Sequence, residues 1–428
     1  MHASLHAEIF KCRRIGQVIE VVIGQLILRL VLRPMCHCRA SLGQAMRMFK
    51  LQLSLLRPRI HRIAASQGCE ATIVASQRSL PCAHALSDAM AVRSWARAVA
   101  LLGSVFSLSS PADPRIGKLL RDAGVEGPYR ATELESGFCN DVFRVDADAR
   151  DGAPVVVKLF SGMAKARCDA ACRGVVDVAV GAAGLGPEIL LRTEDALVCE
   201  FVAGAEIDEA AVHANDCALA VDVLAPKLRR LHALPSPPPL PRAPAALWRG
   251  VDAMLGGAGG GPIALERLER EAARMRRAVG AVAEADVLGH GDLKPSNVML
   301  GADGAATFID FELAGPNYRG YDIFKLFRTA GPSPVSDQNL GRFVEAYLGE
   351  TASASAVDHV RLETRLFEPL TWLEAAIFFS FASVQLPEKR SEMAALAADR
   401  WRAYEAVAGG AFDANVRALE RHAAVERR

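Results

Sequence analysis

The stretch from residue 287 to residue 324 constrains the fold of this chain most, because its polar residues stand at fixed intervals around two short apolar runs. His290, Asp292 and Asn297 follow the spacing H-x-D-x-x-x-x-N, and Ile309-Asp310-Phe311 comes after the second run. The two runs, VML and ATF, predict a short strand pair. A hairpin at this point would bring Asn297 and Asp310 close together.

These residue types suit phosphoryl transfer to a hydroxyl group. The reaction needs a carboxylate to orient the attacking alcohol and accept its proton, and oxygen ligands for the Mg²⁺ that bridges the phosphates. Asp292 suits the first role, and Asn297 and Asp310 suit the second. His290 is better placed to hold the backbone of the loop than to act as a base. An ordinary polar loop is the alternative, but the motif positions agree in both order and spacing.

Further candidates lie upstream, among strand-like runs. Lys158 ends the run Val155-Val156-Val157-Lys158 and matches the strand lysine that binds phosphates in kinases. A stretch between two strand patterns lies where a kinase has the loop that covers the phosphates, although it has one Gly rather than three. Its candidate nucleotide-binding residues are Ser136, Gly137 and Asn140. Backbone groups near Glu200 and Val202, at the end of a third strand pattern, could pair with adenine.

The texture of the chain changes near residue 205. Before it, a helix (111–124), three strand patterns and one helical stretch (164–183) predict a β-rich lobe. After it, helical periodicity dominates, over residues 208–233, 263–284, 337–348, 357–385 and 389–408. We therefore predict an α+β, two-lobed, protein-kinase-like fold. Its N-lobe would span 111–205, and its larger, mainly helical C-lobe would span 206–428.

The composition is that of a soluble globular protein with a sizeable core: 428 residues, 51% hydrophobic and 23% charged. The 50 Lys and Arg nearly balance the 49 Asp and Glu. This balance argues against a nucleic-acid partner, because gripping nucleic acid needs a basic surface. Nothing in the sequence predicts the oligomeric state.

Residues 1–110 are expected to form a basic leader outside the folded body. Residues 1–100 contain fourteen Lys or Arg but only four acidic residues, a profile that suits an organelle transit segment or a region that does not fold. The one membrane candidate, residues 15–32, is interrupted by Glu20 and Arg29. Transit segment, membrane anchor and non-native extension all stay open for the leader. The body is expected to be cytoplasmic, with any membrane contact made through the leader.

The block IDFELAGPNYRGYDI (309–323) resembles the choline/ethanolamine kinase family block I-D-F-E-Y-A-x-x-N-Y-R-G-F-D-I. That family lies within the protein-kinase-like and aminoglycoside-phosphotransferase-like superfamily, and the likeness covers about residues 130–405. The resemblance implies ATP-dependent phosphorylation of choline or ethanolamine, the first step of phosphatidylcholine or phosphatidylethanolamine synthesis. It implies that Asp292 is the catalytic base, that Asn297 and Asp310 bind Mg²⁺, and that Glu312 is a further carboxylate beside the metal. Asp322 and Arg319 would support the catalytic loop. Glu200 and Val202 would form the adenine-binding hinge.

Two departures from the family pattern concern charged residues. The Glu of the family's small-lobe helix aligns with Arg173, while Asp169 and Asp177 lie one turn to either side. The catalytic loop carries Gly291 and Lys294 where the family usually has Asn and no Lys. Lys294 could offset charge on the transferring phosphoryl group or simply be solvated.

Other departures concern the acceptor. The family's Glu-Trp pair aligns with Thr329-Ala330, and the two tryptophans of its cation cage align with Phe378 and Phe381. A Phe face attracts a cation less than a Trp face, and these two Phe could equally be core residues. Choline relies on such a cage, so we expect a kinase of a small amino alcohol that uses ATP and Mg²⁺, with ethanolamine favoured. An aminoglycoside-type phosphotransferase and a nucleotide-binding pseudokinase scaffold are the alternatives.

Overall fold

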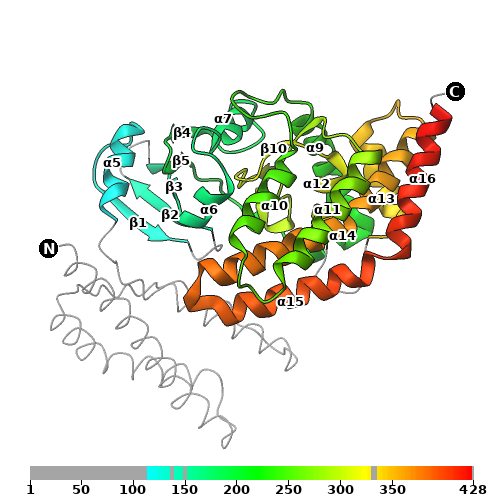
Figure 1. Cartoon of the computed structure of the whole chain (residues 1–428). Helices are drawn as coiled ribbons and strands as arrows, with labels where there is room; N and C mark the ends of the chain where they lie inside the picture. Colours follow the sequence, from blue (N-terminus) through cyan, green and yellow to red (C-terminus); the bar gives the residue numbers. More distant parts are fainter. Residues whose placement is uncertain (1–112, 135–138, 148–151, 329–334, 427–428) are drawn as a thin grey trace, which may run out of the picture. The chain divides into compact units, whose positions relative to one another are not determined.

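The computed structural model describes residues 113–134, 139–147, 152–328 and 335–426, which are drawn in colour in Figure 1. The chain divides into two compact units, Met1–Ala112 and Asp113–Arg428, and the described residues all belong to the second. The predictions for the leader, for Ser136 and Gly137, and for the Thr329-Ala330 pair lie outside the described residues.

The second unit begins with a small lobe built on a five-stranded antiparallel sheet in the order β1-β2-β3-β5-β4 (Figure 1). Its strands are β1 (Tyr129–Glu133), β2 (Asn140–Ala147), β3 (Val155–Phe160), β4 (Ile189–Arg192) and β5 (Ala196–Glu200). Helix α5 (Pro114–Asp122) covers one face, where Ile116 shares an apolar cluster with Val157 of β3. Because side chains alternate along a strand, the neighbouring Lys158 lies on the opposite face.

Two short helices, α6 (Gly162–Arg167) and α7 (Val175–Ala182), connect β3 to β4. The Ser161 hydroxyl caps α6 by accepting a hydrogen bond from the backbone N–H of Ala164 at 3.3 Å. The prediction of one helix over 164–183 is wrong, because the chain leaves helical geometry after Arg167 and Gly174 has a φ of 70° just before α7. The break places Arg167 at the end of a short helix.

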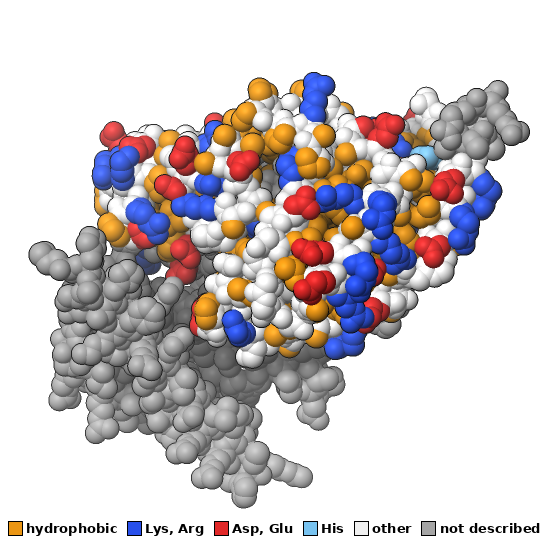
Figure 2. All heavy atoms as spheres, in the orientation of Figure 1, with side chains coloured by type: hydrophobic (Ala, Val, Ile, Leu, Met, Phe, Trp, Pro, Cys, Tyr) orange, Lys and Arg blue, Asp and Glu red, His pale blue; other side chains and the backbone are white. Residues whose placement is uncertain are grey.

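The large lobe is mainly helical, and its longest helix, α14, packs against α10 to α13, α15 and α16 (Figure 1). The α-helices are α8 (Glu209–Leu219), α9 (Ala225–His232), α10 (Ala246–Gly257), α11 (Leu265–Val282), α12 (Arg319–Phe327), α13 (Asp337–Leu348), α14 (Ala354–Gln385), α15 (Arg390–Val407) and α16 (Gly410–Glu426). A π-helix, η3 (Ala220–Leu224), joins α8 to α9, and two 3₁₀ turns are η4 (Pro295–Asn297) and η5 (Pro387–Lys389). Figure 2 shows acidic and basic side chains interspersed on the face in view.

Five short strands of the large lobe place its loops. They are β6 (Ala205–Glu206), β7 (Val287–Gly289), β8 (Val298–Leu300), β9 (Ala306–Phe308) and β10 (Gly315–Asn317). β8 pairs with both β9 and β6, and β10 pairs with β7, all antiparallel. The loop before β8 therefore lies beside the loop after β9, and the N–H of Ile309 donates to the carbonyl of Asn297 at 3.0 Å.

The predicted fold class is confirmed: a β-sheet lobe precedes a mostly helical lobe. The predicted hairpin between Asn297 and Asp310 is present as β8 and β9, whereas the sequence patterns missed β1, β4, β6, β7 and β10. Within the described part of the chain, no helix is by itself long and apolar enough to cross a membrane. Only α14 together with the segment Pro387–Val407 meets that test by length and composition, as a pair bent by 116°.

A glycine in the loop between β7 and β8 provides a test of how tightly this loop is held. Gly291 has a φ of 80°, and a Cβ there would overlap the carbonyl oxygen of Leu313. Gly304 has the same φ but no atom within 4 Å of a Cβ. We expect Gly304→Ala to lower the free energy of unfolding by about 1–2 kcal/mol, the cost of left-handed backbone. Gly291→Ala should lower it by at least about 2 kcal/mol more, because the loop must also shift.

Urea unfolding of both variants of the full chain, followed by tryptophan fluorescence, measures the difference. Equal losses would mean that the loop relaxes freely around the new methyl group.

Candidate active site

The buried carboxylate of Asp322, in the first turn of α12, binds the backbone of the loop after β7. This carboxylate accepts hydrogen bonds from the N–H groups of His290 at 2.6 Å and Gly291 at 2.9 Å. It also lies 3.0 Å from Nε2 of His232. Burial alone would raise the pKa of Asp322, but His232 and the backbone donors outweigh it and lower the pKa. The carboxylate therefore stays ionised and fixes the loop.

His290 lies inside this loop and is fully buried. Its Nε2 is 3.0 Å from the carbonyl of Ile309, and the N–H of Asp292 points to its Nδ1 at 3.3 Å. This pattern fits a neutral ring that donates through Nε2 and accepts through Nδ1. Burial lowers the pKa of His290, which keeps the ring neutral. His290 thus connects the loop before β8 with the loop after β9. With both ring nitrogens in use, it is not available as a base.

Asp292 is the carboxylate that these contacts position, and two cations face it. The Nζ of Lys325 is 2.8 Å from its Oδ1, and the Nζ of Lys294 is 3.3 Å from its Oδ2. Burial would raise the pKa of Asp292, but Lys325 and Lys294 outweigh it and hold the pKa well below its usual range. Asp292 is therefore an ionised hydrogen-bond acceptor at neutral pH.

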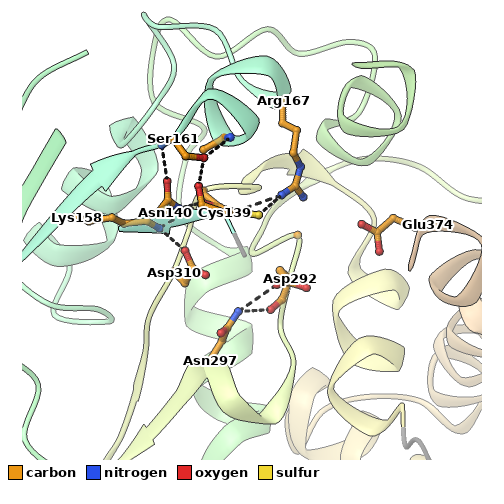
Figure 3. A network of polar contacts seen from close by, with 12 residues as sticks. Cys139, Asn140, Lys158, Ser161, Arg167, Asp292, Asn297, Asp310 and Glu374 are labelled. Atoms are coloured by element: carbon orange, nitrogen blue, oxygen red, sulfur yellow. Dashed lines mark hydrogen bonds and ion pairs between the residues drawn. The ribbon is translucent and has the colours of Figure 1, made fainter. Parts of the chain in front are cut away.

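Asn297 and Asp310 lie near Asp292 and carry side-chain oxygen atoms (Figure 3). The amide nitrogen of Asn297 donates to the carbonyl of Asp292 at 2.8 Å, so its Oδ1 is the atom that would ligate a metal. Asp310 has a φ of 68°, a left-handed backbone uncommon outside Gly, Asn and Asp. Such strain is typical of functional sites.

Asn297 and Asp310 suit Mg²⁺ rather than a metal that is held entirely by protein ligands. The described residues contain no group of three or more His, Cys, Asp or Glu side chains that could hold a metal ion. Mg²⁺ usually binds through one or two carboxylates together with substrate phosphates and water. Asn297 and Asp310 match that pattern.

A lysine of the small lobe points toward the carboxylate of Asp310 (Figure 3). Lys158 of β3 forms an ion pair with Asp310 and lies 3.4 Å from Oε2 of Glu312. Burial would lower the pKa of Lys158, but Asp310 and Glu312 raise it above its usual value. Asn140, at the start of β2, donates to Oε2 of Glu312 at 2.6 Å. The structure therefore brings together Lys158, Asn140, Asp310 and Glu312 from two lobes.

Asp177 of α7 lies one helical turn from the position that aligns with the family's helix Glu. It lines the same pocket as Lys158 and Glu312, and its charge helps to raise the pKa of Lys158. Burial raises the pKa of Asp177 to about 6. Arg173, which aligns with the family's Glu, instead donates to the carbonyl of Cys168 at 2.9 Å and lies outside α7.

Three charged residues that the sequence did not single out also act on this site: Lys325, Glu374 and Arg167. Arg167 lines the same pocket as Lys158 and Glu312. Lys325 is 3.1 Å from Oε2 of Glu374 on α14 and 3.1 Å from the hydroxyl of Tyr321. Its position within the apolar run Ile323–Phe327 was the available signal, since a lone lysine buried on a helix needs charged partners. Glu374 and Arg167 are brought to the cleft only by tertiary packing.

The remaining predicted residues lie in three places. Phe378 is partly buried, and the guanidinium of Arg167 stacks on its ring, 5.0 Å from the centroid. Phe381 is 2% exposed in the core of the large lobe, so the predicted substrate role does not fit its position. Arg319 pairs with the buried Glu363 at 2.8 Å and supports the start of α12. Glu200 and Val202 lie at the end of β5, where the chain passes to the large lobe.

The phosphotransferase enzyme family matches residues 130–357, more than half of the chain. No curated protein matches the chain significantly.

Three solved structures similar to this chain carry kinase names. One is a choline kinase from Cryptosporidium parvum Iowa II, with 15% identity and a TM-score of 0.53 over 67% of this chain and 91% of that chain. Another is an ethanolamine kinase from Plasmodium vivax, with 16% identity and a TM-score of 0.54 over 67% and 84%. A choline/ethanolamine kinase family protein from Mesorhizobium loti has 20% identity and a TM-score of 0.50 over 72% and 95%. These likenesses show a shared fold.

The contact between Lys325 and Asp292 predicts a shift in pH dependence. Lys325→Met removes the cation that most lowers the pKa of Asp292, so that pKa rises. The ionised base is then lost at a higher pH, and we expect the acid limb of the kcat/KM profile for phosphoryl transfer to move to higher pH. Lys294→Met, whose side chain is 44% exposed, should move it less because solvent screens its charge.

Lys118→Met is the control, because Lys118 is exposed and pairs with Asp122 on α5. Superimposable profiles for Lys325→Met and the unmodified chain would show that Lys325 does not tune Asp292.

Proposed function

Because this chain belongs to the phosphotransferase enzyme family, we propose that it transfers the γ-phosphoryl group of ATP to the hydroxyl group of a small amino alcohol. One observation carries the proposal: Lys158, Asn297 and Asp310 meet beside the ionised carboxylate of Asp292. Phosphoryl transfer needs this combination, a phosphate-binding cation and metal ligands beside an acceptor for the hydroxyl proton.

Asp292 accepts the hydrogen bond of the acceptor hydroxyl and orients its oxygen toward the γ-phosphorus. The new O–P bond forms as the bond to the β-phosphate oxygen breaks, ADP leaves, and the hydroxyl proton passes to Asp292. Lys158 offsets charge on the phosphates from the small lobe. Lys294, 3.3 Å from Asp292, offsets charge on the phosphoryl group in transfer.

Magnesium would be held by Asn297 and Asp310, and it would neutralise charge on the β- and γ-phosphates. Until the nucleotide and metal bind, Lys158 compensates the charge of Asp310. Asn297 meanwhile keeps its amide plane fixed through the carbonyl of Asp292.

The acceptor end of the cleft favours ethanolamine over choline. A primary ammonium group can donate hydrogen bonds to Glu374, whereas a trimethylammonium group cannot and depends on aromatic faces. Phe378 already has Arg167 over its ring, and Phe381 is buried in the core. A product of this kind would serve phosphatidylethanolamine synthesis.

A pseudokinase role is the second candidate considered from sequence, and the absent helix Glu was its support. The position of Asp177 weakens that support, because Asp177 places a carboxyl group in the same pocket as Lys158.

A panel of acceptors tests the proposal. The full chain, incubated with ATP and Mg²⁺, should phosphorylate ethanolamine with a higher kcat/KM than choline, and N-methylated ethanolamines should fall between them. Phosphorylated product is measured by mass spectrometry. Turnover of kanamycin alone would point to an aminoglycoside-type enzyme, and nucleotide binding without turnover of any alcohol would point to a pseudokinase.

Asp292→Asn separates catalysis from nucleotide binding. We expect kcat to fall by at least about 100-fold, because the amide cannot accept the proton, while the affinity for ATP stays within about threefold because binding rests on Lys158 and Asp310. Initial rates and calorimetric ATP titration measure the two quantities, with melting temperature as the control for folding. An active Asn variant would remove Asp292 from its assigned role.

A further inference from the structure

Two arginine side chains from different parts of the large lobe lie on one indole ring, that of the partly buried Trp372 on α14. The guanidinium carbon of Arg328, directly after α12, is 5.0 Å from the ring centroid, and that of Arg400, on α15, is 5.5 Å from it. Each cation is attracted to the ring. The two like charges are nevertheless held close together, which costs free energy unless an anion lies nearby.

Arg328 has no such anion among the described residues. Its Nη1 donates to the carbonyl oxygen of Thr371 at 2.8 Å, and no described carboxylate forms an ion pair with it. Residues 329–334, which follow Arg328 in the chain, contain neither Asp nor Glu. The charge of Arg328 is therefore neutralised neither by a described acid nor by the residues that follow it.

Arg400 is compensated only in part. Its Nη1 is 2.8 Å from Oδ2 of Asp399, but that carboxylate is 52% exposed and also pairs with Arg402. Burial and the charge of Arg328 lower the pKa of Arg400, whereas Asp399 and Glu209 act in the opposite direction. The acidic neighbours thus do not offset burial and the second cation together.

The arginine pair lies beside the catalytic cleft and shares no residue with it. α12 and α14 form the contact between Lys325 and Glu374 at 3.1 Å, and one helical turn away they are joined by the contact between Arg328 and Thr371. Neither the loop around Asp292 nor the phosphate-binding lysine of the small lobe takes part. The pair is therefore a separate group of cations.

The chemistry of two guanidinium groups favours a phosphate as their ligand. A guanidinium has five N–H donors, and the described residues accept from only one nitrogen of each of these two. Paired N–H groups match the oxygen atoms of phosphate. A phosphate monoester carries nearly two negative charges and three acceptor oxygens, whereas a carboxylate has a single charge and two oxygens.

We infer that Arg328 and Arg400 bind the phosphate group of a small phosphorylated molecule at a site separate from the nucleotide site, with Trp372 holding both guanidinium groups in place. A small ligand suits the partial burial of the pair, because the side chain of Arg400 is only 22% exposed and a lipid surface contacts exposed groups. The inference goes beyond the proposed kinase function and does not depend on it.

A titration of the full chain with inorganic phosphate tests the inference. Mg²⁺ and a non-hydrolysable ATP analogue are present at saturating concentration, so that phosphate does not enter the nucleotide site. At pH 8 inorganic phosphate is mostly a dianion, and its binding is followed by phosphorus NMR line broadening. We expect saturable binding of phosphate, and binding of acetate that is at least about 10-fold weaker because acetate has one charge fewer.

The variants Arg328→Met and Arg400→Met should each raise the Kd for phosphate by about 10- to 100-fold, the usual contribution of a hydrogen bond between charged groups. Arg400→Lys, which keeps the charge, should retain part of the affinity. The matched control is Arg402→Met, because Arg402 lies on the same helix and is 69% exposed. It loses the same charge, and its Kd should stay within about twofold of the unmodified chain. Melting temperature checks that each variant folds.

Four outcomes would overturn the inference. The first is no saturable binding of phosphate to the unmodified chain, and the second is an unchanged Kd in folded Arg328→Met and Arg400→Met. An equal loss of affinity in Arg402→Met would reduce the effect to net charge, and equal affinity for acetate would remove phosphate as the ligand class. Binding to vesicles that contain phosphatidic acid, lost in the two Met variants while free phosphate does not bind, would assign the arginines to a lipid surface instead.

Discussion

The catalytic geometry depends on one buried carboxylate, that of Asp322. By accepting from the N–H groups of His290 and Gly291, it fixes the backbone just before Asp292. A charge without solvent is tolerated there only because every donor is in place. His290 then extends the constraint to Ile309, next to Asp310. The positions of Asp292, the proposed base, and Asp310, the proposed metal ligand, are thereby set by one chain of hydrogen bonds.

A second constraint is the pairing of charges across the cleft. Lys158 compensates Asp310 and Glu312, and Lys325 compensates Asp292 and Glu374. In each case the ion pairs offset the cost of burying the lysine's charge. This pairing suits binding of a nucleotide, whose phosphates and metal would exchange with the protein's own partners. Arg167 differs from these lysines, because its buried Nε–H has no hydrogen-bond acceptor among the described residues.

The sequence predicted the parts of the site that depend on short-range order. The hairpin between Asn297 and Asp310 and the place of Lys158 on a strand follow from local sequence patterns, and the structure has both. The break after Arg167 could not be read from helical periodicity, because the residues that leave helical geometry, 168–174, contain no proline and only one glycine, Gly174. Glu374 and Arg167 lie far from the catalytic loop in sequence, so only packing of α14 and α6 brings them to it. Phe381 fitted a family position but faces the core.

The most direct measurement is a crystal structure of the full chain with Mg²⁺ and a non-hydrolysable ATP analogue. The account predicts that Mg²⁺ is ligated by Oδ1 of Asn297 and by Asp310, that Nζ of Lys158 contacts the phosphates, and that Asp292 faces the γ-phosphate across open space for an alcohol. A nucleotide bound elsewhere, or phosphates out of reach of Lys158 with Asp310 unligated, would contradict it.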